Sequence, residues 1–173
     1  MAAATYRIRS ARPDDATGVG ALLRLLDAMH ARLVPGFFNK PEEKGGGQPD
    51  AKRDAAMLAR LLHTQGSLLL VAERTRAGAS DLVGLLFQQI YETPADPSLR
   101  RCRRVHVESL VVDPRCRRRG LGRTLLETGE AWAKQLGAVQ MVLTVWSGNA
   151  AGDRFYDALG YRTASRVMYR ELT

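Results

Sequence analysis

The chain has 173 residues, of which 45% are hydrophobic and 25% charged, so we expect a single folded domain over residues 1–173. Lysine and arginine outnumber aspartate and glutamate by 26 to 18, and the resulting net charge of +8 raises the question of an anionic partner. The basic residues are scattered along the chain and aromatic residues make up only 6%, which argues against a nucleic-acid-binding surface.

Cysteine content and hydropathy exclude further classes of protein. The two cysteines, Cys102 and Cys116, are too few for a disulfide framework or a four-cysteine zinc site, and we expect no bound metal. No apolar run approaches the roughly 18 to 20 residues of a membrane helix, and the first residues lack an apolar signal core. These observations favour a cytoplasmic protein without a membrane partner.

In the first half of the chain, hydrophobic periodicity predicts a strand, two helices and a hairpin. The strand is Thr5–Ala11, the helices run from Pro13 to Leu33 and from Asp50 to His63, and the hairpin strands are Ser67–Glu73 and Asp81–Glu92. Proline and glycine are frequent in Val34–Pro49, which we therefore expect to be a loop between the two helices.

The second half predicts a strand–helix–strand unit, then a short helix and a closing strand. These segments are Cys102–Pro114, Gly120–Leu136, Ala138–Trp146, Asn149–Gly160 and Tyr161–Leu172. A right-handed crossover makes the two strands of the first unit parallel, whereas the earlier hairpin is antiparallel. We therefore expect an α/β fold, with a mixed central sheet of about six to seven strands flanked by about four helices.

A turn rich in arginine and glycine joins the strand ending at Pro114 to the next helix. Gly120 and Gly122 let a ligand approach the backbone closely, and the start of the helix offers unpaired N–H groups. The arginines around them, whose guanidinium groups suit phosphate oxygens, are Arg117, Arg118, Arg119 and Arg123. The spacing matches neither a Walker loop nor a dinucleotide fingerprint, so a nucleic acid, a small phosphate ligand and a solvated loop all remain open.

Two motifs in this half resemble the GNAT superfamily of acetyl-CoA-dependent N-acetyltransferases. The acyl-CoA signature of that family is Arg or Gln, two residues, Gly, one residue, then Gly or Ala, and it matches residues 117–122. The strand that precedes it in the family matches Leu110–Pro114. The second motif is an Asn that opens a helix carrying Phe-Tyr and ending in Leu-Gly-Tyr, and it matches Asn149, Phe155–Tyr156 and Leu159–Tyr161.

The resemblance is sharp over Val105–Arg162 and implies a GNAT-like sheet that splays at the cofactor site. Acetyl-CoA is then a co-substrate whose pyrophosphate binds the arginine–glycine turn, while its pantetheine arm pairs with the preceding strand. The residues implied in cofactor binding are Leu110, Val111, Val112, Arg117, Arg118, Arg119, Gly120, Leu121, Gly122, Arg123, Asn149 and Tyr156. The backbone N–H of Val111 is also implied as a donor to the oxyanion.

The resemblance further implies two catalytic groups. Tyr156 would donate a proton to the departing sulfur, with plain aromatic packing as the other interpretation. Glu108 would accept the proton of the amine, directly or through a water, with a surface ion pair as the other interpretation. Glu108 lies two positions before Leu110 and nominally on the same face of the strand, although a bulge would shift that parity. His106 is the alternative base.

The implied reaction is direct transfer of an acetyl group, in a ternary complex, to a primary amine of a small molecule or peptide. The acceptor is not identified, but the loops Val34–Pro49 and Thr93–Arg101 are expected to line its pocket. The alternatives are a coenzyme A-binding regulatory or scaffold protein without turnover, and a basic nucleic-acid-binding module. Because dimerisation through the closing strand is common in that family, a homodimer is a further expectation.

Overall fold

The computed structural model describes residues 4–39, 48–94 and 96–172, and its centre is one mixed five-stranded sheet in the order β1-β2-β3-β4-β5. The strands are β1 (Thr5–Ser10), β2 (Ser67–Arg76), β3 (Ala79–Glu92), β4 (Arg103–Val112) and β5 (Gln140–Leu143). The first four strands pair antiparallel, and β5 pairs parallel with β4. The expected α/β class with a mixed sheet is therefore confirmed.

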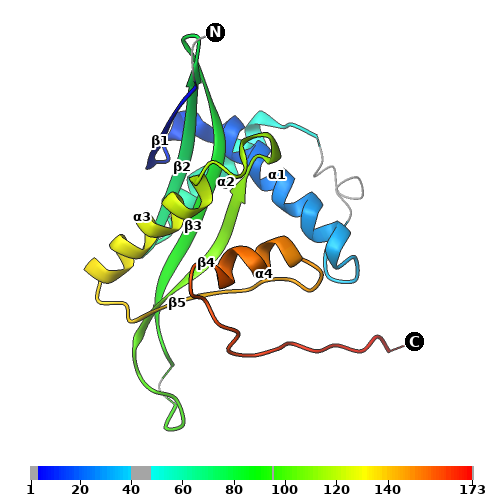
Figure 1. Cartoon of the computed structure of the whole chain (residues 1–173), viewed down its shortest axis with the longest axis vertical. Helices are drawn as coiled ribbons and strands as arrows, with labels where there is room; N and C mark the ends of the chain where they lie inside the picture. The colour runs from blue at the N-terminus through cyan, green and yellow to red at the C-terminus, as the bar shows by residue number, and fades with distance from the viewer. Residues whose placement is uncertain (1–3, 40–47, 95, 173) are drawn as a thin grey trace.

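Helices cover both faces of this sheet (Figure 1). They are α1 (Ala16–Leu33), α2 (Ala51–Leu62), α3 (Leu121–Gln135) and α4 (Ala150–Asp157), with 3₁₀ turns η1 (Pro13–Asp15) and η3 (Pro114–Cys116). α1 and α2 pack on one face and α3 on the other, while α4 lies against the first turn of α3. No helix among the described residues is long and apolar enough to span a membrane.

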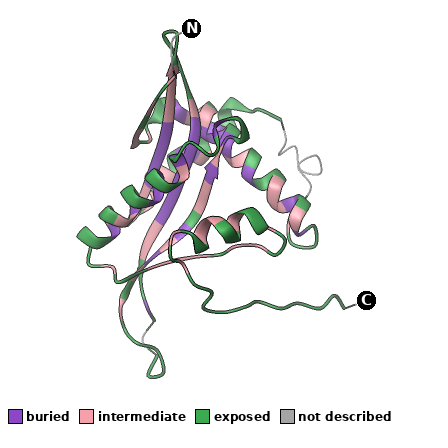
Figure 2. Cartoon of the chain, in the orientation of Figure 1, coloured by how far each residue is buried: buried purple, intermediate pink, exposed green. Residues whose placement is uncertain are grey.

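Two apolar clusters hold the helices to the sheet, one on each face. The cluster beneath α1 and α2 contains Val19, Leu22, Leu26, Leu58, Val71, Leu85 and Val111. The cluster beneath α3 contains Leu70, Val83, Leu86, Val107, Leu121, Leu125 and Leu126. Figure 2 shows that the buried positions follow the middle strands and the inner sides of the helices. Because each fully buried leucine contributes about 1.5–3 kcal/mol, these clusters fix both layers.

A buried ion pair ties α1 to α2. Arg24 donates to both carboxylate oxygens of Asp54, at 2.6 Å and 3.2 Å, and the Asp54 side chain is only 2% exposed. The two helices meet closely at Gly20, where an added Cβ would lie 2.2 Å from the Asp54 carboxyl carbon. The helices are therefore fixed to each other by direct contact, in addition to their contacts with the sheet.

The predicted closing strand Tyr161–Leu172 is wrong, because that segment forms no strand and the sheet has five strands rather than six to seven. The Tyr161 hydroxyl lies 3.9 Å from the Met141 sulfur, beside the second residue of β5. An antiparallel strand that began there would run past the start of β5 almost at once. The segment instead leaves the sheet as an extended tail, with Val167 86% and Met168 91% exposed (Figure 1).

Candidate active site

The site forms where β4 and β5 separate. Their parallel pairing begins at Arg104 and Gln140 and ends at Val107 and Leu143. β5 is shorter than the predicted strand, because the chain turns away into the segment that leads to α4. β4 continues for five more residues, Glu108–Val112, of which Ser109–Val112 pair with β3 alone and Glu108 has no partner in the described sheet. One edge of this part of β4 is therefore open.

The register shows which backbone groups face the open edge. The N–H of Asp113 donates to Val83 O at 2.8 Å, and pairing alternates along an antiparallel ladder. The N–H and C=O groups of Leu110 and Val112 therefore point to the open edge, whereas those of Val111 point to β3. The expected oxyanion contact from the Val111 N–H consequently has no support in the register. The available groups are the N–H and C=O of Leu110 and the N–H of Val112, because the Val112 C=O accepts from Arg117 Nε.

A β-bulge places Glu108 at the start of the opening. Phe87 pairs with Ser109 and Gln88 with Val107, so Glu108 is the extra residue on β4. After the bulge, Leu110 packs with the cluster beneath α3. Glu108 instead contacts His106, which faces α1 because the next residue, Val107, packs beneath α3. The expectation that Glu108 and Leu110 share a face is therefore wrong, and the inserted residue is the reason.

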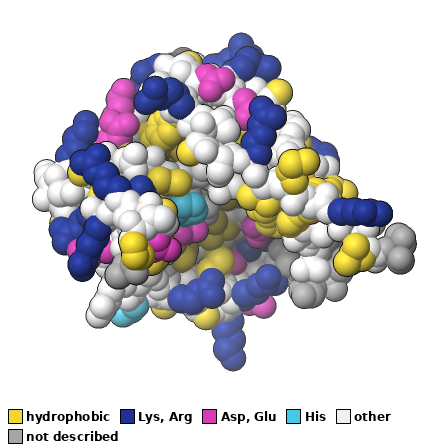
Figure 3. All heavy atoms as spheres, turned by 90° about the horizontal axis from the view of Figure 1, so that it is seen from below, with side chains coloured by type: hydrophobic (Ala, Val, Ile, Leu, Met, Phe, Trp, Pro, Cys, Tyr) yellow, Lys and Arg dark blue, Asp and Glu magenta, His cyan; other side chains and the backbone are white. Residues whose placement is uncertain are grey.

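Glu108 and His106 form a pair on this face. His106 Nδ1 lies 2.9 Å from Glu108 Oε1, and the two side chains are 31% and 41% exposed. From below, the surface is hollowed, with histidine, acidic and hydrophobic side chains on its walls (Figure 3). The two groups that the sequence suggested as alternative bases are therefore in direct contact with each other.

Tyr156 lies on the other face of the sheet, packed on the same apolar cluster as Leu110 and Val112. It lies on α4, packs against the cluster beneath α3 and contacts the rings of Phe155 and Tyr161, with centroids 5.1 Å and 5.5 Å away. Burial, with a smaller contribution from Tyr161, raises the pKa of Tyr156 to about 12. Its phenol is therefore protonated at neutral pH and can donate a proton; within the described residues its hydroxyl makes no hydrogen bond.

The arginine–glycine turn presents a row of unpaired amides. Gly120 caps α3 in the left-handed conformation, with φ 80°, and Arg118 is also left-handed, with φ 60°. In the part of the chain that the structure describes, no backbone N–H from Arg118 to Arg123 has an acceptor, and the first paired amide donates from Thr124 to Gly120 O. Amides exposed in this way at the start of a helix form an anion site.

The two glycines of the turn have different structural roles. A Cβ on Gly120 would meet nothing within 4 Å, so this residue is required by its φ and leaves the turn open to a ligand. A Cβ on Gly122 would lie 3.2 Å from the Phe155 ring, so this residue lets α4 pack closely on α3. The sequence motif does not separate these roles, because the partner of Gly122 is distant along the chain.

The four arginines of the turn are all exposed, but they differ in their partners. Arg117 Nε donates to Val112 O at 3.1 Å, and the Arg119 guanidinium lies 6.0 Å from the centre of the Tyr6 ring. Arg123 faces Glu127 at 3.8 Å. Among the described residues, the Arg118 guanidinium alone of these four has no hydrogen-bond, ion-pair or ring partner, so it is the most available for a phosphate.

Asn149 has a structural role in this site. Its side-chain oxygen accepts from the backbone N–H of Gly152 at 3.0 Å and so caps α4. This cap begins the helix that carries Tyr156. The expected contact of Asn149 with the cofactor stays a prediction, and the cap is the role that the geometry shows.

The two loops expected to bind the acceptor lie at different distances from Glu108. Residues 40–47 of the first loop are outside the described residues, but Phe37 and Phe38 pack on Trp146 with centroids 5.3 Å and 5.0 Å away. Trp146 lies three residues beyond the end of β5, which places this loop near the opening. The second loop joins β4 at Cys102, roughly 20 Å along the strand from Glu108.

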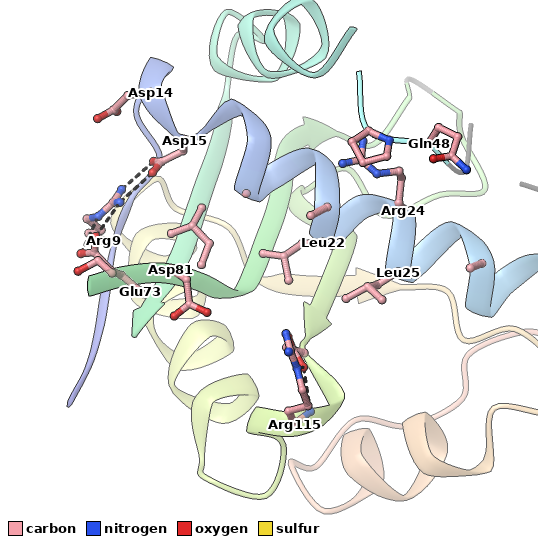
Figure 4. A pocket seen from close by; sticks show the side chains of 17 residues that line it. Arg9, Asp14, Asp15, Leu22, Arg24, Leu25, Gln48, Glu73, Asp81 and Arg115 are labelled. Carbon is pink, nitrogen blue, oxygen red and sulfur yellow. Dashed lines mark hydrogen bonds and ion pairs between the residues drawn. The ribbon is translucent and has the colours of Figure 1, made fainter. Parts of the chain in front are cut away.

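A cavity of about 1100 Å³ lies beside the turn, between α1, the β2–β3 hairpin and Arg115 (Figure 4). Its charged groups are largely paired, as in the Arg9–Asp15 contact of 2.7 Å and the Arg115–Asp113 contact of 2.6 Å. Hydrogen bonds from these arginines hold the pKa of each aspartate below its usual value. Because neither Glu108 nor Tyr156 lines it, this cavity is separate from the opening between β4 and β5.

Solved structures share this fold. A mutant of the BH1408 protein from Bacillus halodurans aligns with TM-score 0.80 and 22% identity, over 96% of this chain and 99% of that one. An aminoglycoside antibiotic 6'-N-acetyltransferase from Acinetobacter baumannii gives 0.68 and 18%, over 98% and 99%. An aminoglycoside N-acetyltransferase in complex with CoA gives 0.66 and 18%, over 99% and 97%.

Comparison with known sequences gives fewer matches than comparison with solved structures, but it identifies the family. No curated protein matches the chain. The model of the acetyltransferase (GNAT) family matches residues 33–161, a range that includes β4, β5, the turn and all of α4. The separated strands, the amide-rich turn and the family match agree, and the chain belongs to the acetyltransferase (GNAT) family.

Proposed function

We propose that this protein is an N-acetyltransferase that moves an acetyl group from acetyl-CoA directly to a primary amine. One observation carries the proposal: the open edge of β4 brings together an anion-binding turn, an acidic group and a protonated phenol. A screen of amine classes with free coenzyme A as the readout tests it. Binding of acetyl-CoA without turnover on any class would favour the regulatory or scaffold alternative.

Acetyl-CoA fits the open edge and the turn. Its pyrophosphate would take the unpaired amides between Arg118 and Arg123, with the Arg118 guanidinium as a further donor. Its pantetheine arm would pair with the open-edge N–H and C=O of Leu110 and the N–H of Val112, while the Val112 C=O is held by Arg117. The CoA complex of a structural neighbour supports this choice of co-substrate.

The chemistry requires three proton transfers. The acceptor, an ammonium with a pKa near ~10, loses a proton to Glu108 directly or through a water, and its nitrogen attacks the thioester carbon. A C–N bond forms and the C–S bond breaks, while an open-edge N–H of β4 stabilises the oxyanion. Tyr156 gives its proton to the sulfur and regains one from the amine nitrogen, so each turnover releases one proton to solvent.

We also propose that the protein forms a homodimer through its C-terminal tail. The outer edge of β5 is unpaired in the described sheet, and the tail is extended with exposed Val167 and Met168. Such a segment can add to the strand edge of a second copy.

If the tail joins two copies, light scattering should give twice the chain mass of 19.1 kDa for the parent protein. Replacing Val167 and Met168 with lysine should give the single-chain mass, because charged side chains oppose strand addition. The matched control makes the same replacements at Thr163 and Ser165, which are exposed polar residues of the same tail, and this variant should stay dimeric. A parent protein that runs as a monomer would contradict the proposal.

Gly120→Val should abolish binding of acetyl-CoA while the fold survives. A branched side chain in the left-handed conformation is strained and would crowd the amides of the turn. Isothermal titration calorimetry measures the affinity. Gly78→Val is the matched control, because Gly78 has φ 82° and equally open surroundings but lies at the β2–β3 turn. Unchanged affinity in the Gly120 variant would place the phosphate site elsewhere.

Tyr156→Phe should lower kcat by about 10²–10⁴-fold, because general acid catalysis contributes that much. The dissociation constant of acetyl-CoA should stay within a few-fold of the parent value, since the ring is kept. Tyr161→Phe is the control, because within the described residues the one hydrogen bond of the Tyr161 hydroxyl is to the Met141 sulfur, at 3.9 Å. Parent-like turnover by the Tyr156 variant would leave this residue as packing alone.

Glu108→Gln should reduce kcat/KM most at low pH, where nearly all of the acceptor is ammonium and must lose a proton. The deficit should shrink as the pH rises toward the pKa of the amine, because more acceptor arrives already neutral. A pH–rate profile of parent and variant measures this. A deficit that is constant with pH would indicate acceptor positioning instead, and no deficit would remove Glu108 from proton transfer.

A further inference from the structure

We infer that His106 is a positioning residue, whose ring N–H holds the Glu108 carboxylate at the mouth of the opening between β4 and β5. This inference rests on the proposed acetyl transfer, in which Glu108 accepts the amine proton. His106 then acts through Glu108 and does not itself contact the acceptor.

The direction of the hydrogen bond follows from its partners. His106 Nδ1 and Glu108 Oε1 lie 2.9 Å apart. An ionised carboxylate can only accept, so Nδ1 must carry the hydrogen, whether the imidazole is neutral or charged. A neutral His106 is therefore held in the Nδ1–H tautomer, with its lone pair on Nε2.

Glu108 needs such a partner because its position gives it little other support. It is the inserted residue of the bulge and the first residue of β4 beyond the pairing with β5. Its side chain is 41% exposed, and within the described residues its only hydrogen bond or ion pair is the one with His106. A long carboxylate side chain without that contact would spread over several rotamers.

His106 has the support that Glu108 lacks. It pairs with Gln89 on β3 and with Val142 on β5, so its backbone is fixed from both sides. It also lies inside the paired region, two positions before Glu108, whereas Glu108 is at the opening itself. His106, whose backbone is fixed, therefore positions the carboxylate, and Glu108, which lies at the opening, contacts the acceptor.

Two substitutions of His106 separate the possible roles. His106→Asn keeps a donor, because the amide nitrogen of asparagine lies close to the place of Nδ1, and His106→Leu removes the donor while filling similar space. With acetyl-CoA and the best amine of the screen, the Leu variant should lose about 10-fold to 100-fold in kcat, the effect of one hydrogen bond to a charged group. The KM for acetyl-CoA should not change, and the Asn variant should stay within a few-fold of the parent.

Other outcomes would overturn the inference. Parent-like kcat in both variants would show that the contact does not matter for turnover. Equal losses in both would show that the imidazole itself takes the proton. In the Glu108→Gln background, His106→Leu should add little further loss, because the positioned group is already gone; full additivity would contradict this.

A measurement on the unmodified protein does not depend on turnover. ¹⁵N NMR of the histidine side chains should show neutral His106 as the Nδ1–H tautomer, and Glu108→Ala should abolish that preference. An Nε2–H tautomer in the parent protein would overturn the inference even if every substituted protein failed to fold. If no amine is acetylated, the proposed function fails, and the tautomer still decides whether the contact exists.

Discussion

The short pairing between β4 and β5 is the constraint on which the rest of the site depends. A parallel ladder of four residue pairs ends at Leu143, and β4 continues without a neighbour on that side. Unpaired strand edges are costly inside a protein and are normally covered. Here the uncovered backbone of Leu110 and Val112 lies between the amide-rich turn and the bulged Glu108, so the gap has the character of a binding cleft rather than of a packing defect.

The two faces of the sheet supply different chemistry to this gap. The α1 face carries the Glu108–His106 pair, which is partly exposed to solvent. The other face carries Tyr156, a residue of α4 whose burial raises the pKa of its phenol to about 12. A phenol and a carboxyl group already differ widely in their ordinary pKa values, so the proposed donor and the proposed acceptor can be in the required protonation states at the same pH.

Hydrophobic periodicity was sufficient to predict the helices and the first five strands, because each has an apolar stripe or alternation that matches the face it buries. The arginine–glycine turn was also recognisable, since unpaired amides and left-handed glycine follow from local sequence. The closing strand was predicted wrongly because the β-branched and aromatic residues of Tyr161–Leu172 indicate strand propensity, while a strand also needs a free partner edge. Propensity alone contains no information about where β5 ends.

The finer geometry of the site could not be predicted from the sequence, for a related reason. The bulge at Glu108 depends on a register shift against Phe87 and Gln88, about twenty residues earlier in the chain. That shift turns Leu110 to the other face, and the hydrogen-bonding parity of β4 turns the Val111 N–H away from the cleft. The approach of Phe155 to Gly122 likewise joins two motifs that are separate in sequence. Such features become visible only when pairing partners are known.

The Arg24–Asp54 contact between α1 and α2 determines how much change the connection between these two helices tolerates. Because the two helices contact each other directly and also pack on the sheet, the connection between them is not required to hold either helix in place. Loop closure entropy changes only slowly with length, so insertions or exchanges there carry a small thermodynamic penalty. The connection is therefore suited to be exchanged as a unit between scaffolds, while both helices and the sheet keep their places.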